Sequence, residues 1–245
     1  MNAKQALREL RSLGTAQNRK VYARHGVGEP TFGVSYAHLY KLQKKIGVDH
    51  EAAEGLWASG VHDARVLASL VADPERMNAR KLQTWVKELD NYVLSDAFSG
   101  LAARSPAAGA VVGKWTASKH EWIGATGWNV LAHLLTADMG FPQADLERYL
   151  KTIEKNIHAS RNRTRYSMNN ALIAIGIAGG DLERKAVAAA KRIGPVEVDH
   201  GQTGCKTPDA VTYIPRAAAH RRKKAAKTSG SKKKTARKAS LRKKA

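Results

Sequence analysis

The feature that most constrains the fold is a series of short amphipathic segments, each about the length of one helix. Within them apolar residues recur at spacings of three and four, the periodicity of an α-helix with one buried face. Gly, Pro or a capping Ser, Asn or Asp separates one segment from the next. Pairs of segments closed by an aromatic or leucine stripe recur about every 35 to 40 residues, a period typical of HEAT and armadillo solenoids.

We therefore predict an all-α fold, a HEAT-like or armadillo-like α-solenoid of about 10–12 helices. Ser35 and Asn78 are predicted N-caps, and Gly47 is a predicted C-terminal stop. Further helices are expected to begin near Asn91 and after Ser118. The other predicted helices cover residues 2–13, 16–24, 52–58, 61–71, 105–112, 145–157, 164–177 and 181–193.

Composition supports a helical protein and limits the cellular compartments in which we expect it. Ala and Leu are abundant, and the 245 residues include only 7 Pro. No apolar run reaches the roughly 20 residues that a membrane helix needs, and the N-terminus lacks the apolar core of a signal peptide. A single cysteine, Cys205, excludes an internal disulfide. We expect a monomer in the cytoplasm, associated with the nucleoid, with no membrane partner and no cofactor.

The positive charge is concentrated at the C-terminus. The chain carries a net charge of +21, of which residues 216–245 contribute +14 without a single acid. Such an excess points to a polyanion, most simply DNA. We predict three parts: a solenoid domain over residues 1–193, an irregular segment punctuated by Gly and Pro over residues 194–215, and a disordered Lys/Arg-rich tail over residues 216–245.

The segment from Trp85 to Asp96 holds the best candidate for chemistry. If a helix starts near Asn91, Tyr92 and Asp96 lie four residues apart on one face. The ring could face a cationic group, and the carboxylate could supply charge or a proton site. The structural alternative is a core tyrosine and a solvated or capping acid.

Three motifs together resemble a known family. They are Phe32-Gly33-Val34-Ser35 with its following leucines, residues 56–65, and the segment from Trp85 to Asp96. In this order and spacing they resemble the DNA alkylation repair proteins, the AlkD-like HEAT-repeat DNA glycosylases, and the resemblance covers residues 16–193. It implies a helical repeat fold that holds double-stranded DNA. It also implies an enzyme that removes purines alkylated at N3 or N7. Asp96 would be the catalytic residue, stabilising an oxocarbenium-like sugar.

The resemblance also indicates which residues would contact substrate and where this sequence departs from the family pattern. Tyr92 takes the place of the usual aromatic neighbour, and Trp122 or Trp128 could supply a further ring. The family arginine falls at Gly124 or Ala125, and a second family tryptophan falls at Asn170. We therefore expect Tyr92, Trp122, Trp128 and Asn170 to contact substrate.

Basic residues outside these motifs are predicted to bind DNA phosphates. Arg161, Arg163 and Arg165 precede or begin a predicted helix, and Lys119 could extend the same strip. In the C-terminal region, non-specific contacts are expected from Arg221, Arg222, Lys223, Lys224, Lys232, Lys233 and Lys234.

Residues 199–209 are polar and rich in glycine. Asp199, His200 and Cys205 are too few and wrongly spaced for a standard zinc site, so we predict no metal and expect a loop that caps the last repeat. The favoured function is a DNA-binding DNA alkylation repair protein that excises alkylated purines. The alternative is a catalytically inactive HEAT-like module that binds DNA or acts as a scaffold, and a third is a metal-dependent hydrolase centred on His200 and Cys205.

Overall fold

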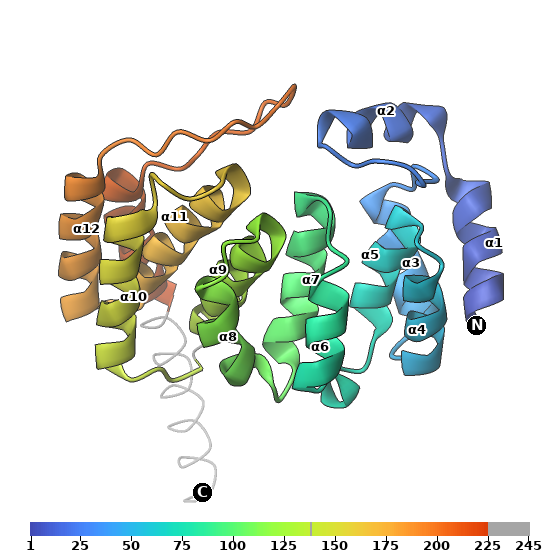
Figure 1. Ribbon diagram of the computed structural model, residues 1–245, viewed down its shortest axis with the longest axis horizontal. Coiled ribbons are helices and arrows are strands. Elements are labelled where there is room, and N and C mark those ends of the chain that lie inside the picture. Colours follow the sequence, from blue (N-terminus) through green and yellow to red (C-terminus); the bar gives the residue numbers. More distant parts are fainter. Residues whose placement is uncertain (138, 225–245) are drawn as a thin grey trace, which may run out of the picture.

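The computed structural model describes residues 1–137 and 139–224, and within these residues all regular structure is helical (Figure 1). The all-α prediction is confirmed. The helices are α1 (Ala3–Leu13), α2 (Ala16–Arg24), α3 (Tyr36–Ile46), α4 (His50–Ala58), α5 (His62–Val71), the 3-10 turn η1 (Pro74–Arg76), α6 (Ala79–Val86), α7 (Tyr92–Arg104), α8 (Ala108–Thr116), α9 (Glu121–Thr136), α10 (Gln143–Asn156), α11 (Asn162–Ile177) and α12 (Asp181–Ile193).

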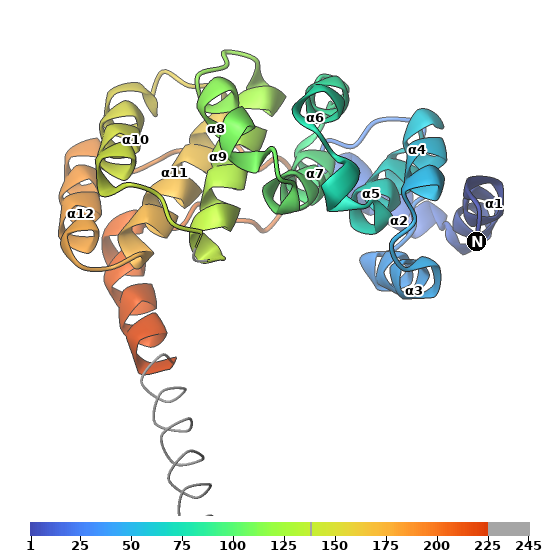
Figure 2. The same ribbon diagram turned by 90° about the horizontal axis from the view of Figure 1, so that it is seen from below.

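The helices stack into a curved two-layer solenoid (Figures 1 and 2). Figure 2 shows α5, α7, α9 and α11 side by side in an inner layer, with α4, α6, α8 and α10 along the outer (upper) side of the arc. The arc opens between α3 at one end and the helical residues 210–224 at the other. This is the predicted HEAT-like architecture. None of the described helices is long and apolar enough to cross a membrane.

Capping side chains set several of the helix starts. Asn2, Ser35, Asn78 and Asn91 each accept a hydrogen bond from a backbone N–H in the first turn of the helix that follows. Other boundaries differ from the prediction: α4 begins at His50 because Asp49 caps it, α8 covers Ala108–Thr116, and α9 begins only at Glu121. The helices α10 and α11 each begin two residues early, at Gln143 and Asn162.

A chain of aromatic rings joins the middle repeats. Trp57 and Trp85 stack with ring centroids 4.1 Å apart and an interplanar angle of 6°. Phe98 packs against both rings, and Trp115 lies 6.2 Å beyond Phe98. Offset aromatic contacts of this kind add to the ordinary gain from burial. Trp85 is thus a core residue, as its position in an apolar stripe predicted.

A buried carboxylate joins the first two family-like motifs. Asp63 is fully buried and accepts hydrogen bonds from the backbone N–H groups of Phe32 at 2.6 Å and Val34 at 2.7 Å. The Thr31 hydroxyl donates to the same carboxylate at 2.8 Å. The Asp63 carboxylate therefore holds the irregular loop before α3 against the start of α5. In these two motifs it serves to stabilise the fold.

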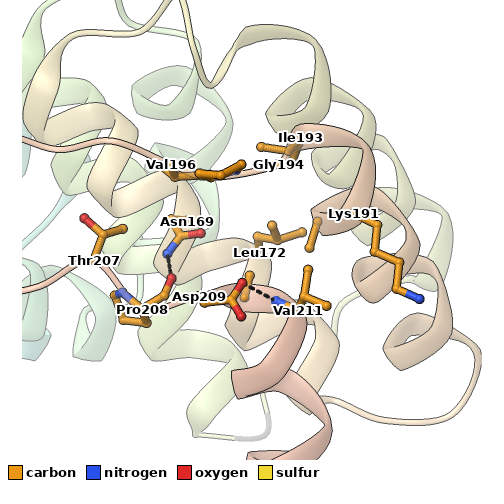
Figure 3. Close-up of a pocket in the computed structure, with 13 residues that line it drawn as sticks. Asn169, Leu172, Lys191, Ile193, Gly194, Val196, Thr207, Pro208, Asp209 and Val211 are labelled. Atoms are coloured by element: carbon orange, nitrogen blue, oxygen red, sulfur yellow. Dashed lines mark hydrogen bonds between the residues drawn. The ribbon is translucent and has the colours of Figure 1, made fainter.

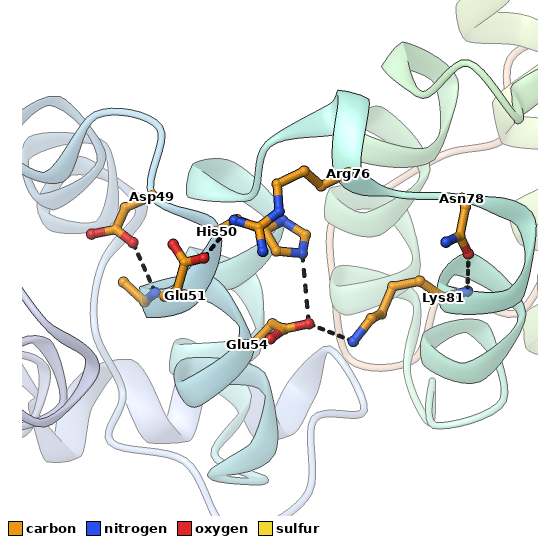
Figure 4. Close-up of polar contacts among 8 residues, drawn as sticks. Asp49, His50, Glu51, Glu54, Arg76, Asn78 and Lys81 are labelled. Atoms are coloured by element: carbon orange, nitrogen blue, oxygen red, sulfur yellow. Dashed lines mark hydrogen bonds and ion pairs between the residues drawn. The ribbon is translucent and has the colours of Figure 1, made fainter.

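Ion pairs connect α4 to the elements that follow it (Figure 4). Glu51 pairs with Arg76 of η1 and Glu54 pairs with Lys81 of α6, both at 2.5 Å. His50 Nε2 lies 3.6 Å from the same Glu54 oxygen. Exposed ion pairs contribute at most about 1 kcal/mol each. These contacts therefore add little to the stability of the fold, which depends mainly on the buried residues.

The C-terminal region differs from the prediction. Residues 194–209 are irregular, but residues 210–224 are helical, so the predicted boundary at residue 215 is wrong. Ala210, Ile214 and Ala218 form a buried stripe at helical spacing. Ile214 packs so closely on Gly176 of α11 that a Cβ there would lie 2.6 Å from it. The predicted disorder of residues 225–245 concerns residues outside the described ranges.

We predict that Asp63→Asn lowers the free energy of unfolding by about 3 kcal/mol, because an amide N–H₂ would face backbone N–H groups in a buried site. Chemical denaturation would measure the change. Glu51→Gln, which alters an exposed pair, is the matched control and should change stability by less than about 1 kcal/mol. Equal losses for the two variants would show that the Asp63 contacts are unimportant.

Candidate functional site

Tyr92 and Asp96 occupy one face of the first two turns of α7. The helix begins where it does because the Asn91 side chain accepts a hydrogen bond from the Leu94 N–H at 2.9 Å. The four-residue spacing then places both side chains on the same side. The predicted helix start and the shared face are confirmed.

Asp96 combines solvent access with an unusual electrostatic setting. Its side chain is exposed, and one carboxylate oxygen accepts a hydrogen bond from Asn129 of α9 at 2.8 Å. Protein atoms nevertheless surround the group and displace much of its water, which raises the pKa of Asp96 to about 6. The Arg163 charge and the Asn129 hydrogen bond oppose this rise and are the smaller effects. Asp96 can therefore change protonation close to neutral pH.

An arginine occupies the face of the neighbouring tyrosine. The Arg163 guanidinium carbon lies 3.8 Å from the Tyr92 ring centroid and 4.6 Å from that of Tyr166. Arg163 is only 8% exposed, and its Nε has no hydrogen-bond partner among the described residues. A cation between two ring faces is strongly attracted to both. The sequence predicted Arg163 as part of a phosphate-binding strip and missed this contact.

Close packing of α9 and α11 explains how Arg163 reaches the ring. A Cβ on Gly124 would lie 3.0 Å from the Ser118 carbonyl oxygen and 3.1 Å from Thr164 Oγ1. The Glu121 carboxylate accepts a hydrogen bond from the Arg163 backbone N–H at 2.7 Å. The position on α9 at which the resemblance places a family arginine is therefore occupied by a close contact between the helices. The guanidinium near Tyr92 comes from Arg163 of α11 instead.

Both ends of the chain contribute to the surroundings of Tyr92. His25, just after α2, contacts the Tyr92 hydroxyl through Nδ1, and its ring lies edge-on to the Tyr92 ring. His200 packs edge-on against Tyr166 with centroids 5.4 Å apart. In Figure 1 the irregular segment 194–209 (orange) extends from α12 toward α2, and a Cβ on Gly201 would lie 3.3 Å from the Arg24 carbonyl oxygen.

The polar residues of this segment do not form a metal site. His200 Nε2 lies 3.0 Å from Thr207 Oγ1, and burial together with Arg163 lowers the pKa of His200. Cys205 is exposed. Among the described residues, no three His, Cys, Asp or Glu side chains gather as a metal ion would require. The metal-dependent hydrolase hypothesis therefore gains no support.

The other side chains that the sequence predicted to contact substrate differ in their exposure. Trp128 is only 1% exposed and packs edge-on against Tyr149, so the prediction that it contacts substrate is wrong. Trp122 is half-buried against the core. Asn170 is half-buried on α11 and follows Arg163 and Tyr166 by seven and four residues, the spacing of a shared helix face.

The three arginines do not form one strip. Arg161 is exposed and lines a cavity of about 610 Å³ together with Lys119. Arg165 donates to the carbonyl oxygens of Glu197, His158 and Ser160, so its guanidinium holds the irregular segment beside the start of α11. The continuous strip that the sequence predicted is therefore wrong.

The predicted tail residues also divide. Arg221 and Arg222 lie in the helical residues 210–224, where Arg221 donates to the Ile177 carbonyl at 3.2 Å and Arg222 pairs with Glu183 at 2.5 Å. They contact the solenoid, contrary to their assignment to a disordered tail. Lys223 and Lys224 are exposed at the end of the same segment, and Lys232, Lys233 and Lys234 lie outside the described residues.

A cavity of about 450 Å³ between α11, α12 and the segment 194–211 is separate from Tyr92 and Asp96 (Figure 3). Leu172, Ile193 and Val196 line it, and Asn169 donates to the Pro208 carbonyl at 2.9 Å. Its lining is mostly aliphatic, so this cavity mainly marks where the C-terminal segment docks.

Comparisons with known proteins agree with this geometry. The family model described as DNA alkylation repair enzyme matches residues 5–214. An uncharacterized protein of Listeria innocua is 29% identical over 215 residues, and one of Listeria monocytogenes is 30% identical over 220 residues; each alignment covers 85% of this chain and 94% of the relative.

A solved structure is also similar. It is described as a new family of proteins related to the HEAT-like repeat DNA glycosylases with affinity for branched DNA structures. It superposes with a TM-score of 0.82 at 32% identity and covers 90% of this chain and 95% of its own. This chain therefore belongs to the DNA alkylation repair enzyme family and has the HEAT-like repeat fold of its glycosylases.

Proposed function

We propose that this protein binds DNA on its inner layer and prefers branched DNA to continuous duplex. The observation that carries the proposal is Arg163, a nearly buried guanidinium that lies on the Tyr92 and Tyr166 rings. The affinity for branched DNA described for the similar solved protein supports the preference. In this proposal the protein acts as a monomer in the cytoplasm, associated with the nucleoid.

The position of Arg163 favours binding over base excision. A glycosylase for cationic bases needs an open aromatic face on which the base can stack. Here the guanidinium already covers the Tyr92 face at 3.8 Å, and it would repel a second cation. The same guanidinium can donate N–H hydrogen bonds to a phosphate oxygen. The site therefore suits the DNA backbone better than an alkylated base.

We predict that Arg163→Gln weakens binding to a four-way junction several-fold and reduces the slope of log affinity against log salt by about one, because one phosphate contact is lost. Arg163→Lys should retain more affinity because it keeps the charge. Arg184→Gln, on an 82% exposed side chain of α12, is the control. Fluorescence anisotropy at several salt concentrations would measure the effect.

The comparison of junction and linear duplex decides the main proposal. The wild-type protein should bind the junction more tightly than a duplex of the same length and sequence. Equal affinity for the two DNAs would overturn the preference for branches. Unchanged junction binding by Arg163→Gln would remove Arg163 from the interface.

A second candidate function, excision of alkylated purines, is favoured by one observation. Asp96 is solvent-accessible at the position that the family motif assigns to the catalytic acid. Only the ionised carboxylate stabilises an oxocarbenium-like sugar. With its pKa raised to about 6, Asp96 is protonated below that pH and ionised above it.

If excision occurs, we predict that base release from methylated duplex DNA rises as the pH increases through about 6 and is abolished by Asp96→Asn. Chromatography of released bases would measure it. Release that survives Asp96→Asn would place the chemistry elsewhere. No release by wild-type protein that still binds junctions would leave DNA binding as the function.

The basic C-terminus is proposed to add non-specific affinity. Residues 228–245 carry eight Lys and Arg and no acid. We predict that removing them weakens binding to all DNAs at low salt and flattens the salt dependence, because fewer counterions are released. The melting temperature should stay the same. Identical affinity and salt slope for the full and shortened proteins would contradict this role.

A further inference from the structure

Two tyrosines extend the inner layer beyond Tyr92. Tyr36 and Tyr40 lie one turn apart on α3, with ring centroids 5.8 Å apart and an interplanar angle of 53°. Tyr40 is 49% exposed, although large aromatic side chains are usually buried. Tyr40 belongs to α3, the helix that stands at one end of the arc in Figure 2.

Tyr36 connects this pair to the Tyr92 site. It is half-buried, and Tyr36 and Tyr92 both pack against the small cluster formed by Tyr22, Val27 and Val93. The charge of Asp96 also acts on the Tyr36 hydroxyl, whose pKa is raised chiefly by burial. The aromatic surface therefore runs from the exposed ring of Tyr40 through Tyr36 to the site that holds Asp96.

The charges around Tyr40 fit a polyanion. Lys41 and Lys44 are exposed on the same helix, and neither takes part in a salt bridge within the described part of the chain. Lys45, by contrast, pairs with Glu9 at 2.7 Å. Exposed rings beside cations are the features with which proteins bind unpaired nucleotides, since every base has a stacking face and every linkage a phosphate.

We infer that Tyr36 and Tyr40, flanked by Lys41 and Lys44, form a stacking platform for unpaired bases where a DNA strand leaves its duplex. This inference rests on the proposed function and adds to it: where a branch carries a single-stranded arm, α3 binds that arm. Tyr40 supplies the accessible face, and Tyr36 supports it from the cluster below. The two lysines contact the phosphates of the departing strand.

The test uses the full chain and three DNAs: a flapped duplex with 2-aminopurine as the first unpaired base, a fully paired four-way junction, and a linear duplex. Tyr40→Ala should bind the flap about tenfold more weakly, since the first unpaired base loses the ring on which it stacks. It should also lose the quenching of 2-aminopurine emission that stacking causes. Affinity for the linear duplex should be unchanged.

Two variants separate stacking from general effects. Tyr40→Phe keeps the ring and should behave as the wild type. Tyr213→Ala removes another exposed tyrosine, 38% accessible in the helical residues 210–224, and should leave flap binding unchanged. Thermal melting of each variant would show that it is folded.

The outcomes distinguish this inference from the proposed function. Wild-type flap affinity and quenching in Tyr40→Ala would overturn the platform, even if the wild type still prefers the four-way junction to duplex. Equal wild-type affinity for junction and duplex would overturn the proposed function. Quenching that depends on Tyr40 would then still establish a single-strand site on α3.

Discussion

The contact between α9 and α11 at Gly124 determines the character of the inner layer. Because Gly124 leaves no side chain between the helices, the Thr164 hydroxyl can donate to the Glu121 carbonyl oxygen at 2.9 Å. The Glu121 carboxylate in turn accepts from the Arg163 N–H and fixes the first turn of α11. A Cβ at position 124 would lie 3.0 Å from the Ser118 carbonyl oxygen and 3.1 Å from Thr164 Oγ1, so a larger residue would press on the first turn of α11, which carries Arg163.

Most residues of the family motifs hold the fold. Asp63 fastens the loop before α3, and Trp57 stacks on Trp85 while its indole N–H donates to Glu88 at 3.2 Å. These contacts join neighbouring elements of the solenoid and leave Asp63, Trp57 and Trp85 buried. Of the motif residues, Asp96 alone combines solvent access with a strongly raised carboxyl pKa. The motifs consequently establish the family but leave the reaction to be settled at Asp96 and its neighbours.

The sequence predicted what depends on neighbouring residues and missed what depends on distant ones. Helix starts at Ser35 and Asn91 follow from local capping, and the stripe containing Trp85 follows from helical periodicity. Arg163 reaches Tyr92 only because α9 and α11 pack closely, and no local pattern reveals such a contact. The helix start at residue 210 was missed because Gly201, Gly204 and Pro208 made the preceding segment look like a loop up to Pro215, although Ala210, Ile214 and Ala218 form a regular buried stripe.

Excision and recognition differ here by the placement of one charge. An alkylated base is a cation that stacks on an aromatic face and then leaves, whereas Arg163 is a cation that remains. In the proposed function, the guanidinium at 3.8 Å from the Tyr92 centroid takes the place of such a base and donates hydrogen bonds to phosphate. Near neutral pH the ionised Asp96 would offset that charge locally and weaken the attraction to a continuous DNA backbone. On that proposal a branch is preferred because its shape brings a phosphate within reach of the site.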